Sequence, residues 1–267
     1  MVLMSSFLKG PISRLVFCAI LCFCASVEGR SQADMASESG ESDAPETVFT
    51  HRFETGLSLH TRGMGVHLER GTYRGIGKVN TWSIEVVSMK HPKEVRSFNP
   101  VYDQGKSYVF GKVNSAYMVR LGWGKRTVAT PKVRSGAVAI GWKFAFGPAL
   151  ALAKPVYLVI GYPDIPYRYL LTERYDPDIH GTGDIYGRAG ALNGILEVAP
   201  TPGVFTRVAA DFEYSGSRSS LRTMSVGLNL DVFATPVVIM APQFDQNDAF
   251  FLTLFVHWSF GRQQFKT

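Results

Sequence analysis

The chain has 267 residues, of which 46% are hydrophobic, 12% aromatic and 19% charged, with 26 glycines and a formal net charge of +6. Proteins typically contain ~25% charged residues and ~7% glycine, so this balance argues against a coiled coil or a charged helical bundle. A single apolar stretch approaches the length of a membrane-spanning helix, and it lies near residue 1. The composition therefore excludes a membrane protein built from several helices.

Residues 1–29 have the pattern of a secretory signal peptide. Lys9 and Arg14 precede an apolar run from Leu15 to Ala25, and small residues follow, ending at Gly29. A run of about 11 residues is too short to cross a bilayer, which favours a cleaved signal over the alternative, a permanent membrane anchor. All three cysteines fall in this segment, so the exported chain would contain neither a disulfide nor a thiolate metal site.

Two regions follow the signal peptide. Residues 30–48 are rich in Ser, Glu and Asp without an apolar period, which predicts a disordered polar linker. Residues 49–267 favour strands, because apolar residues recur at every second position and no convincing helical period is found. The clearest alternation runs from Leu221 to Phe233, and the last strand, from Leu252 to Phe260, repeats it.

The two faces of these strands have different compositions. One face is apolar and carries all four tryptophans, while the other combines Gly, Ala, Ser and Asn with charged residues. Tryptophan gathers at the interfaces of membrane barrels, and small or charged side chains suit a narrow lumen. We therefore expect membrane-girdle aromatics at Trp82, Trp123, Trp142 and Trp258. A soluble all-β protein, with the apolar face as its core, is the alternative.

The expected fold is a closed antiparallel up-and-down transmembrane β-barrel of about ten strands, with eight to twelve possible. The expected strands lie near 52–61, 64–73, 78–89, 109–126, 134–146, 149–160, 166–174, 204–214, 220–233 and 248–260. If the N-terminus lies in the periplasm, ten strands would place the long connections 90–108, 175–203 and 234–247 outside the cell. They place the short turns at 75–77, 130–132, 161–163 and 215–219 in the periplasm.

Several segments resemble a family of uncharacterised outer-membrane β-barrel proteins of Bacteroidota-type bacteria. The resemblance covers roughly residues 50–262, and its motifs are Met89–Glu94, Tyr108–Asn114, Lys154–Tyr157, Thr172–Pro177 and Tyr186–Ala189. It implies an outer-membrane barrel without an assigned activity. It also implies that Phe260 or Phe265 is the terminal aromatic residue that the barrel-assembly machinery reads.

The inward face supplies candidate lumen residues of both charges. Paired charges would fill a narrow lumen, because unpaired ions in such an interior are costly; a polar path for a small solute is the alternative. The polar lumen candidates are His60, Glu69, Glu85, Arg120, Lys143, Arg207, Asp211, Glu213 and His257, joined on the same face by Glu54 and Asp231.

Two groups of residues contain side chains that could support catalysis. His60 and His67, with Glu69, could approach each other across a hairpin and bind a metal or act as an acid and a base, but their spacing matches no established site. His257 and Ser259 share a strand face, yet residues two apart lie ~7 Å apart, too far for direct proton transfer. We predict neither catalytic residues nor a metal or other cofactor.

A basic loop segment provides candidate surface residues. Lys90, His91, Lys93 and Glu94, followed by Arg96, could meet acidic glycolipid head groups or dock a partner, unless the loop is only a rigid connection. We expect a structural or surface-binding protein of the outer membrane, in contact with its lipid and not with nucleic acid. A narrow pore and a lipid-modifying barrel enzyme are the alternatives.

Overall fold

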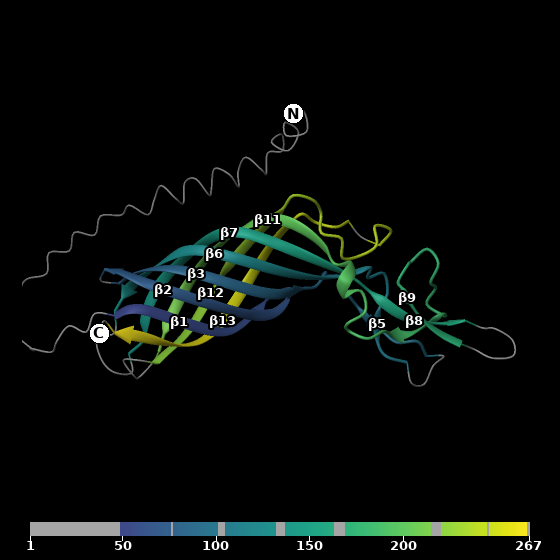
Figure 1. Ribbon diagram of the computed structural model, residues 1–267, viewed down its shortest axis with the longest axis horizontal. Coiled ribbons are helices and arrows are strands. Elements are labelled where there is room, and N and C mark those ends of the chain that lie inside the picture. The colour runs from purple at the N-terminus through teal and green to yellow at the C-terminus, as the bar shows by residue number, and fades with distance from the viewer. Residues whose placement is uncertain are drawn as a thin grey trace, which may run out of the picture. The chain divides into compact units, whose positions relative to one another are not determined.

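The computed structural model describes residues 49–75, 77–100, 105–131, 137–162, 169–214, 220–244 and 246–265. The signal peptide and linker expected from the sequence lie outside these ranges. Eight antiparallel strands close a barrel, in the order β1-β13-β12-β11-β7-β6-β3-β2 (Figure 1). They are β1 (Phe49–His60), β2 (Gly63–Gly75), β3 (Lys78–Met89), β6 (Asn114–Thr130), β7 (Ala139–Pro155), β11 (Ala199–Glu213), β12 (Ser220–Phe233) and β13 (Phe250–Phe265).

Each barrel strand pairs with the barrel strands before and after it in the chain, and β1 pairs with β13 to close the ring. The all-β, up-and-down barrel expected from the alternation is therefore confirmed. The two faces are also as expected, because buried residues alternate with more exposed ones along most of β12 and β13. Side chains of successive residues in a strand point to opposite faces, so the sequence period determines which residues enter the lumen.

The barrel has eight strands where about ten were expected. Residues 139–155 form the single strand β7, so the division into two strands near 134–146 and 149–160, expected because Gly147 and Pro148 resemble a turn, is wrong. Pro148 is exposed on the outer face and pairs in register with Val204 of β11, so the strand continues through it. The expected strand near 166–174 is present in part as β9 (Tyr169–Arg174), but it pairs outside the barrel.

The two ends of the barrel differ in the connections that they carry. The long connections β3–β6, β7–β11 and β12–β13 all leave one end, which we call the loop end. The other end, which we call the terminus end, holds residues 49 and 265 and the connections β2–β3, β6–β7 and β11–β12. The expected grouping of long connections is therefore confirmed. The expected short turn at 161–163 is wrong as a barrel turn, because β8 (Tyr157–Tyr162) belongs to the β7–β11 connection.

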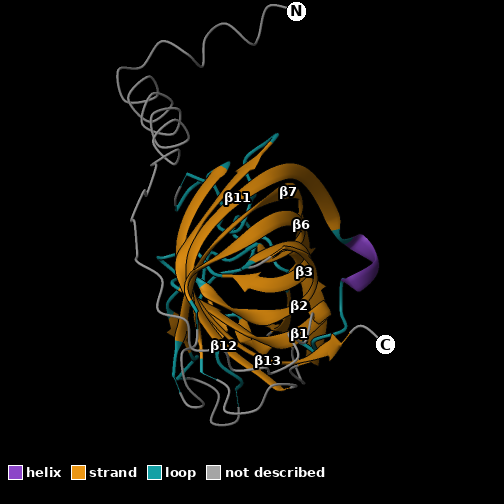
Figure 2. Cartoon of the chain, turned by 90° about the vertical axis from the view of Figure 1, so that its left-hand side faces the viewer, coloured by secondary structure: helices purple, strands orange, loops and turns teal. Residues whose placement is uncertain are grey.

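Small sheets are built within these connections. β8 pairs with β9 and with β10 (Ile185–Arg188) in a three-stranded sheet, and β4 (Arg96–Ser97) pairs with β5 (Tyr108–Val109). Tyr108, Leu158, Ile160, Tyr175 and Ile185 form an apolar cluster that joins these segments. The short 3-10 helix η1 (Ile195–Glu197) precedes β11 and lies outside the barrel wall (Figure 2).

An apolar plug closes the lumen toward the loop end. Val237 and Ile239, from the β12–β13 connection, are buried against inward-facing residues of the wall such as Met118, Phe205 and Phe251. Backbone hydrogen bonds hold this connection in place, because Ile239 O accepts from the N–H groups at 113 and 114. The described residues contain no helix that is long and apolar enough to span a membrane.

Candidate functional site

The outer face of the barrel is an apolar belt. On β13, Phe250, Leu252, Leu254, Trp258 and Phe260 are each 48–55% exposed. Ten residue steps at ~3.3 Å per residue and ~40° of strand tilt give the belt a height of roughly 25 Å, the value typical of membrane barrels. A soluble monomer rarely exposes an apolar surface of this extent.

The four tryptophans all lie on this outer face, with 41–66% of each side chain exposed. Trp82 and Trp123 are cross-strand partners, and Trp142 and Trp258 lie on β7 and β13. Within its strand, each tryptophan is fewer residues from the terminus end than from the loop end. Trp258 Nε1 donates a hydrogen bond of 2.8 Å to the hydroxyl of Tyr214, which fixes the indole at that level.

Charged side chains, unlike the tryptophans, are concentrated in the lumen and near the strand ends. All six carboxylates of the barrel strands are buried in the lumen, at 0–8% exposed. The exposed charged side chains of the same strands are lysines and arginines, and they lie near the strand ends: Arg70, Arg74, Lys78, Lys125, Arg222 and Arg262. The barrel thus buries its carboxylates in the lumen and exposes apolar side chains over most of its outer face, the reverse of a soluble protein.

One buried network surrounds Glu85 near the middle of the lumen. Arg120 donates to Glu85 at 2.8 Å and grips Asp231 with two bonds of 2.7 Å. Arg207 donates to the same Glu85 oxygen, and His257 Nε2 lies 2.9 Å from the other. These residues come from β3, β6, β11, β12 and β13, so the network braces five strands.

A second network lies closer to the terminus end. Lys143 pairs with Glu69 at 2.7 Å and with Asp211 at 3.8 Å, and Arg126 binds Asp211 at 2.9 Å and Glu213 at 3.2 Å. Arg52 joins this network by pairing with Glu54 and, at 3.6 Å, with Glu213. Across both networks five cations face six carboxylates, each in contact with at least one opposite charge. Ion pairing therefore satisfies the charges that burial would otherwise penalise.

The structure brings together eight of the nine lumen candidates in these networks: Glu69, Glu85, Arg120, Lys143, Arg207, Asp211, Glu213 and His257. His60 does not join them, because it lies at the end of β1, where its Nδ1 accepts from Arg62 N at 3.2 Å. Sequence reasoning missed Arg52 and Arg126, which are 1% and 2% exposed. Both continue the inward alternation of their strands, so the period itself contained the signal.

The histidines have other partners than the two hypotheses named, since His257 contacts Glu85 and Ser259 contacts His67. His60 pairs in register with Gly63 and His67 with Gly56, so the two histidines do not face each other across the hairpin. His67 Nε2 instead lies 2.9 Å from Ser259 Oγ, and its ring stacks on His257 at 4.2 Å. Its Nδ1 has no hydrogen-bond partner among the described residues, so this serine–histidine contact lacks the third group that orients a base. The described residues hold no cluster of metal ligands.

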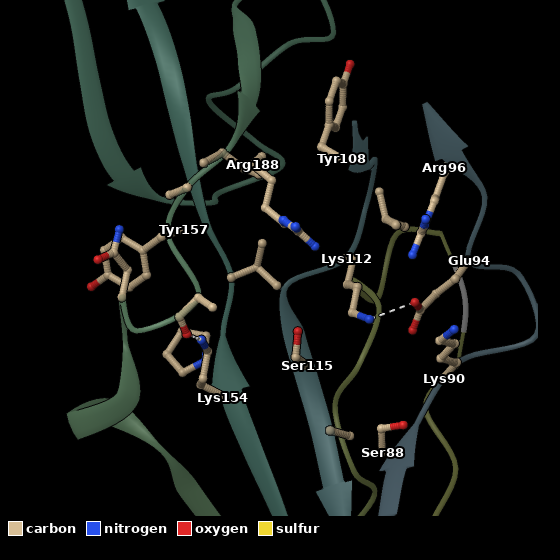
Figure 3. A pocket seen from close by; sticks show the side chains of 18 of the residues that line it. Ser88, Lys90, Glu94, Arg96, Tyr108, Lys112, Ser115, Lys154, Tyr157 and Arg188 are labelled. Atoms are coloured by element: carbon tan, nitrogen blue, oxygen red, sulfur yellow. Dashed lines mark hydrogen bonds and ion pairs between the residues drawn. The ribbon is translucent and has the colours of Figure 1, made fainter. Parts of the chain in front are cut away.

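A cavity of about 480 Å³ lies at the loop end; we call it the basic pocket. It is formed where β3, β6 and β7 end and where the connections containing β4, β5, β8 and β10 pass over them. Figure 3 shows side chains from these segments around the hollow. Five cations and one carboxylate line it: Lys90, Arg96, Lys112, Lys154, Arg188 and Glu94.

Two of the five cations already have partners. Lys112 pairs with Glu94 at 2.7 Å, and Lys154 donates to the carbonyl of Ala191. The side chains of Lys90, Arg96 and Arg188 are exposed and make no hydrogen bond or ion pair within the described part of the chain. The pocket therefore carries an excess of positive charge that an anion would complement.

The four surface-loop candidates separate into two pairs. Lys90 and Glu94 line the basic pocket, whereas His91 and Lys93 do not. His91 is buried and shapes the turn, since its N–H donates to Glu94 at 2.9 Å and its Nδ1 accepts from Lys93 N at 3.3 Å. Sequence reasoning missed Lys112, Lys154 and Arg188 as pocket residues. Each lies in a segment that carries the family resemblance, but nothing local showed that these segments meet.

A scan against protein-family models, a search of curated proteins and a search of solved structures each found no match for this chain.

Proposed function

We propose that this chain is an outer-membrane β-barrel protein that acts as a closed scaffold and presents a cationic binding pocket at its loop end. The observation that carries the proposal is the inverted polarity of the barrel. Every carboxylate of its strands is buried, whereas large apolar side chains, four tryptophans among them, cover the outside. Lipid is the environment in which such an outer surface is stable.

The terminus end would face the periplasm and the loop end the cell surface. In barrels of this type the short turns are periplasmic and the longer loops are external. The grouping of the three long connections at one end fits this orientation. The signal peptide and the assistance of the barrel-assembly machinery belong to the same proposal, as does the family resemblance.

A closed scaffold is favoured over a narrow pore. The lumen contains two charge networks with paired members, and the apolar plug of Val237, Ile239 and their neighbours obstructs the loop end. An ion entering this lumen would have to displace buried ion pairs, and an eight-stranded barrel is just wide enough for its own side chains.

Reconstitution tests the proposal in two steps. We expect the purified protein to insert into phosphatidylcholine vesicles, to migrate faster on a gel before heating than after it, and to leave a planar bilayer silent. Recovery of folded protein from the aqueous fraction without detergent would refute the membrane location. Steady single-channel currents would refute the closed scaffold and support the pore.

A further inference from the structure

We propose that the basic pocket binds the phosphorylated head group of a membrane lipid whose acyl chains lie along the outer wall of β3, β6 and β7. This inference rests on the proposed membrane location and adds to it a ligand class. Three observations support the inference. The polar wall side chains of the pocket point outward, apolar rows of the wall lie beneath the pocket, and the pocket has more cations than carboxylates.

The pocket lies on the outer side of the barrel wall. Its wall-borne side chains Ser88, Ser115, Tyr117 and Lys154 alternate along their strands with the buried residues Met89, Ala116 and Ala153 and therefore point outward. In Figure 3, Ser88 and Ser115 lie where the strands enter the hollow, with Lys90, Lys112, Arg96 and Arg188 farther along. Met89 and Ala116 also line the pocket, but the polar side chains that the wall contributes to it all lie on the outer side.

The strand register places apolar rows directly below the pocket. Ser115 pairs with Lys154, and the next outward row is Ser88, Tyr117 and Leu152. Below it lie the row of Val86, Val119 and Leu150 and then the pair Ile84 and Leu121. The outer surface therefore changes from cationic to apolar within about two rows, each ~7 Å high. This is the spacing over which a lipid changes from head group to acyl chain.

The charge of the pocket selects for phosphate. The side chains of Lys90, Arg96 and Arg188 lack partners in the described residues, and Glu94 is the single carboxylate among the lining residues. A phosphate monoester carries about −1.5 to −2 charges and three acceptor oxygens, which guanidinium groups bind in bidentate fashion. A zwitterionic head group would bring its own cation into an already positive site. At about 480 Å³ the cavity is in the size range of ligand sites.

The test uses the full chain in phosphatidylcholine vesicles that contain a small fraction of spin-labelled phosphatidic acid, which has a phosphate monoester head group. We expect a motionally restricted lipid population in which phosphatidic acid is enriched over spin-labelled phosphatidylcholine. The triple variant Lys90→Gln/Arg96→Gln/Arg188→Gln should reduce this selectivity roughly tenfold or more, since it removes three charge-assisted hydrogen-bond donors.

The matched control removes three outward cations from the terminus end. Arg70→Gln/Lys125→Gln/Arg222→Gln changes the net charge equally, and its three side chains lie on the outer wall far along their strands from the pocket. It should retain the selectivity. Equal loss in both triple variants would show a general surface-charge effect and overturn the inference.

A variant that should bind the lipid more tightly tests the inference without relying on a loss of binding. Glu94→Gln keeps an oxygen that can accept from His91 N, but it removes the negative charge and releases Lys112. Selectivity for phosphatidic acid should rise, and an unchanged or lower value would contradict the inference. If glycerol 3-phosphate added to the buffer displaced the lipid at equal concentration, the pocket would serve a soluble phosphate instead. Failure to insert into vesicles refutes the proposed function, whereas insertion without lipid selectivity refutes this inference alone.

Discussion

Removal of the Glu85 side chain tests whether the lumen charges hold the barrel together. Its carboxylate, 1% exposed, accepts from Ser58 at 2.7 Å, from Arg120 at 2.8 Å and from Arg207, and it lies 2.9 Å from His257 Nε2. In Glu85→Ala, Arg120 keeps Asp231. Arg207 keeps a neutral bond to Asn229 at 2.6 Å and its contacts with the rings of Phe205 and Phe255, but no carboxylate. The variant therefore leaves a buried guanidinium charge without a carboxylate.

The expected cost is large. Breaking a buried ion pair by removing one partner costs about 3–5 kcal/mol, because the remaining charge is uncompensated. Removing the stranded charge as well, in Glu85→Ala/Arg207→Met, should cost no more than the single substitution, since the two residues are directly coupled. The control is the exposed Glu197, which lies 3.8 Å from Arg174 and accepts a hydrogen bond from the Tyr157 hydroxyl. Glu197→Ala should cost under about 1 kcal/mol, because both contacts are exposed to solvent.

Urea unfolding in lipid vesicles, followed by tryptophan fluorescence, measures these differences. Glu85→Ala should lower the free energy of unfolding by several times the effect of Glu197→Ala. A Glu85→Ala barrel as stable as the control variant would refute the reasoning, because the lumen network would then contribute little to the fold.

Three further substitutions are tested in the same unfolding assay. Leu254→Arg, in the middle of the belt on β13, should cost about 2–4 kcal/mol in vesicles, and a neutral effect would contradict a lipid-facing position. Gly227→Val should prevent stable folding, because a Cβ there would lie 2.1 Å from the carbonyl oxygen of Val208; a wild-type unfolding curve would show that this close approach is wrong. Tyr214→Phe removes the acceptor of the Trp258 hydrogen bond and should cost about 0.5–1.5 kcal/mol, with no change arguing that the indole is not held there.

The strand faces were predictable because a period of two is a local property of the sequence. Each buried carboxylate of the lumen could be assigned from its neighbours two residues away, as with Asp231 beside Asn229. Arg52 and Arg126 were missed only because they lie near the ends of their strands, where the expected boundaries were least secure.

The strand number and the basic pocket depend on long-range contacts. Gly147 and Pro148 resemble a turn, and only their pairing with Phe205 and Val204 of β11 shows that the strand continues through them. Lys112, Lys154 and Arg188 are distant in sequence and meet because the small sheets of the connections pass over the wall. No spacing within a single segment could have predicted that meeting.

Quenching of intrinsic tryptophan fluorescence tests the central claim most directly, because all four tryptophans of the chain lie on the outer face of the barrel. In vesicles of brominated phosphatidylcholine we expect strong quenching relative to unbrominated vesicles, together with weak quenching by aqueous iodide. Fluorescence that is unaffected by brominated lipid and readily quenched by iodide would place the apolar belt in water or in a protein interface and would contradict the account.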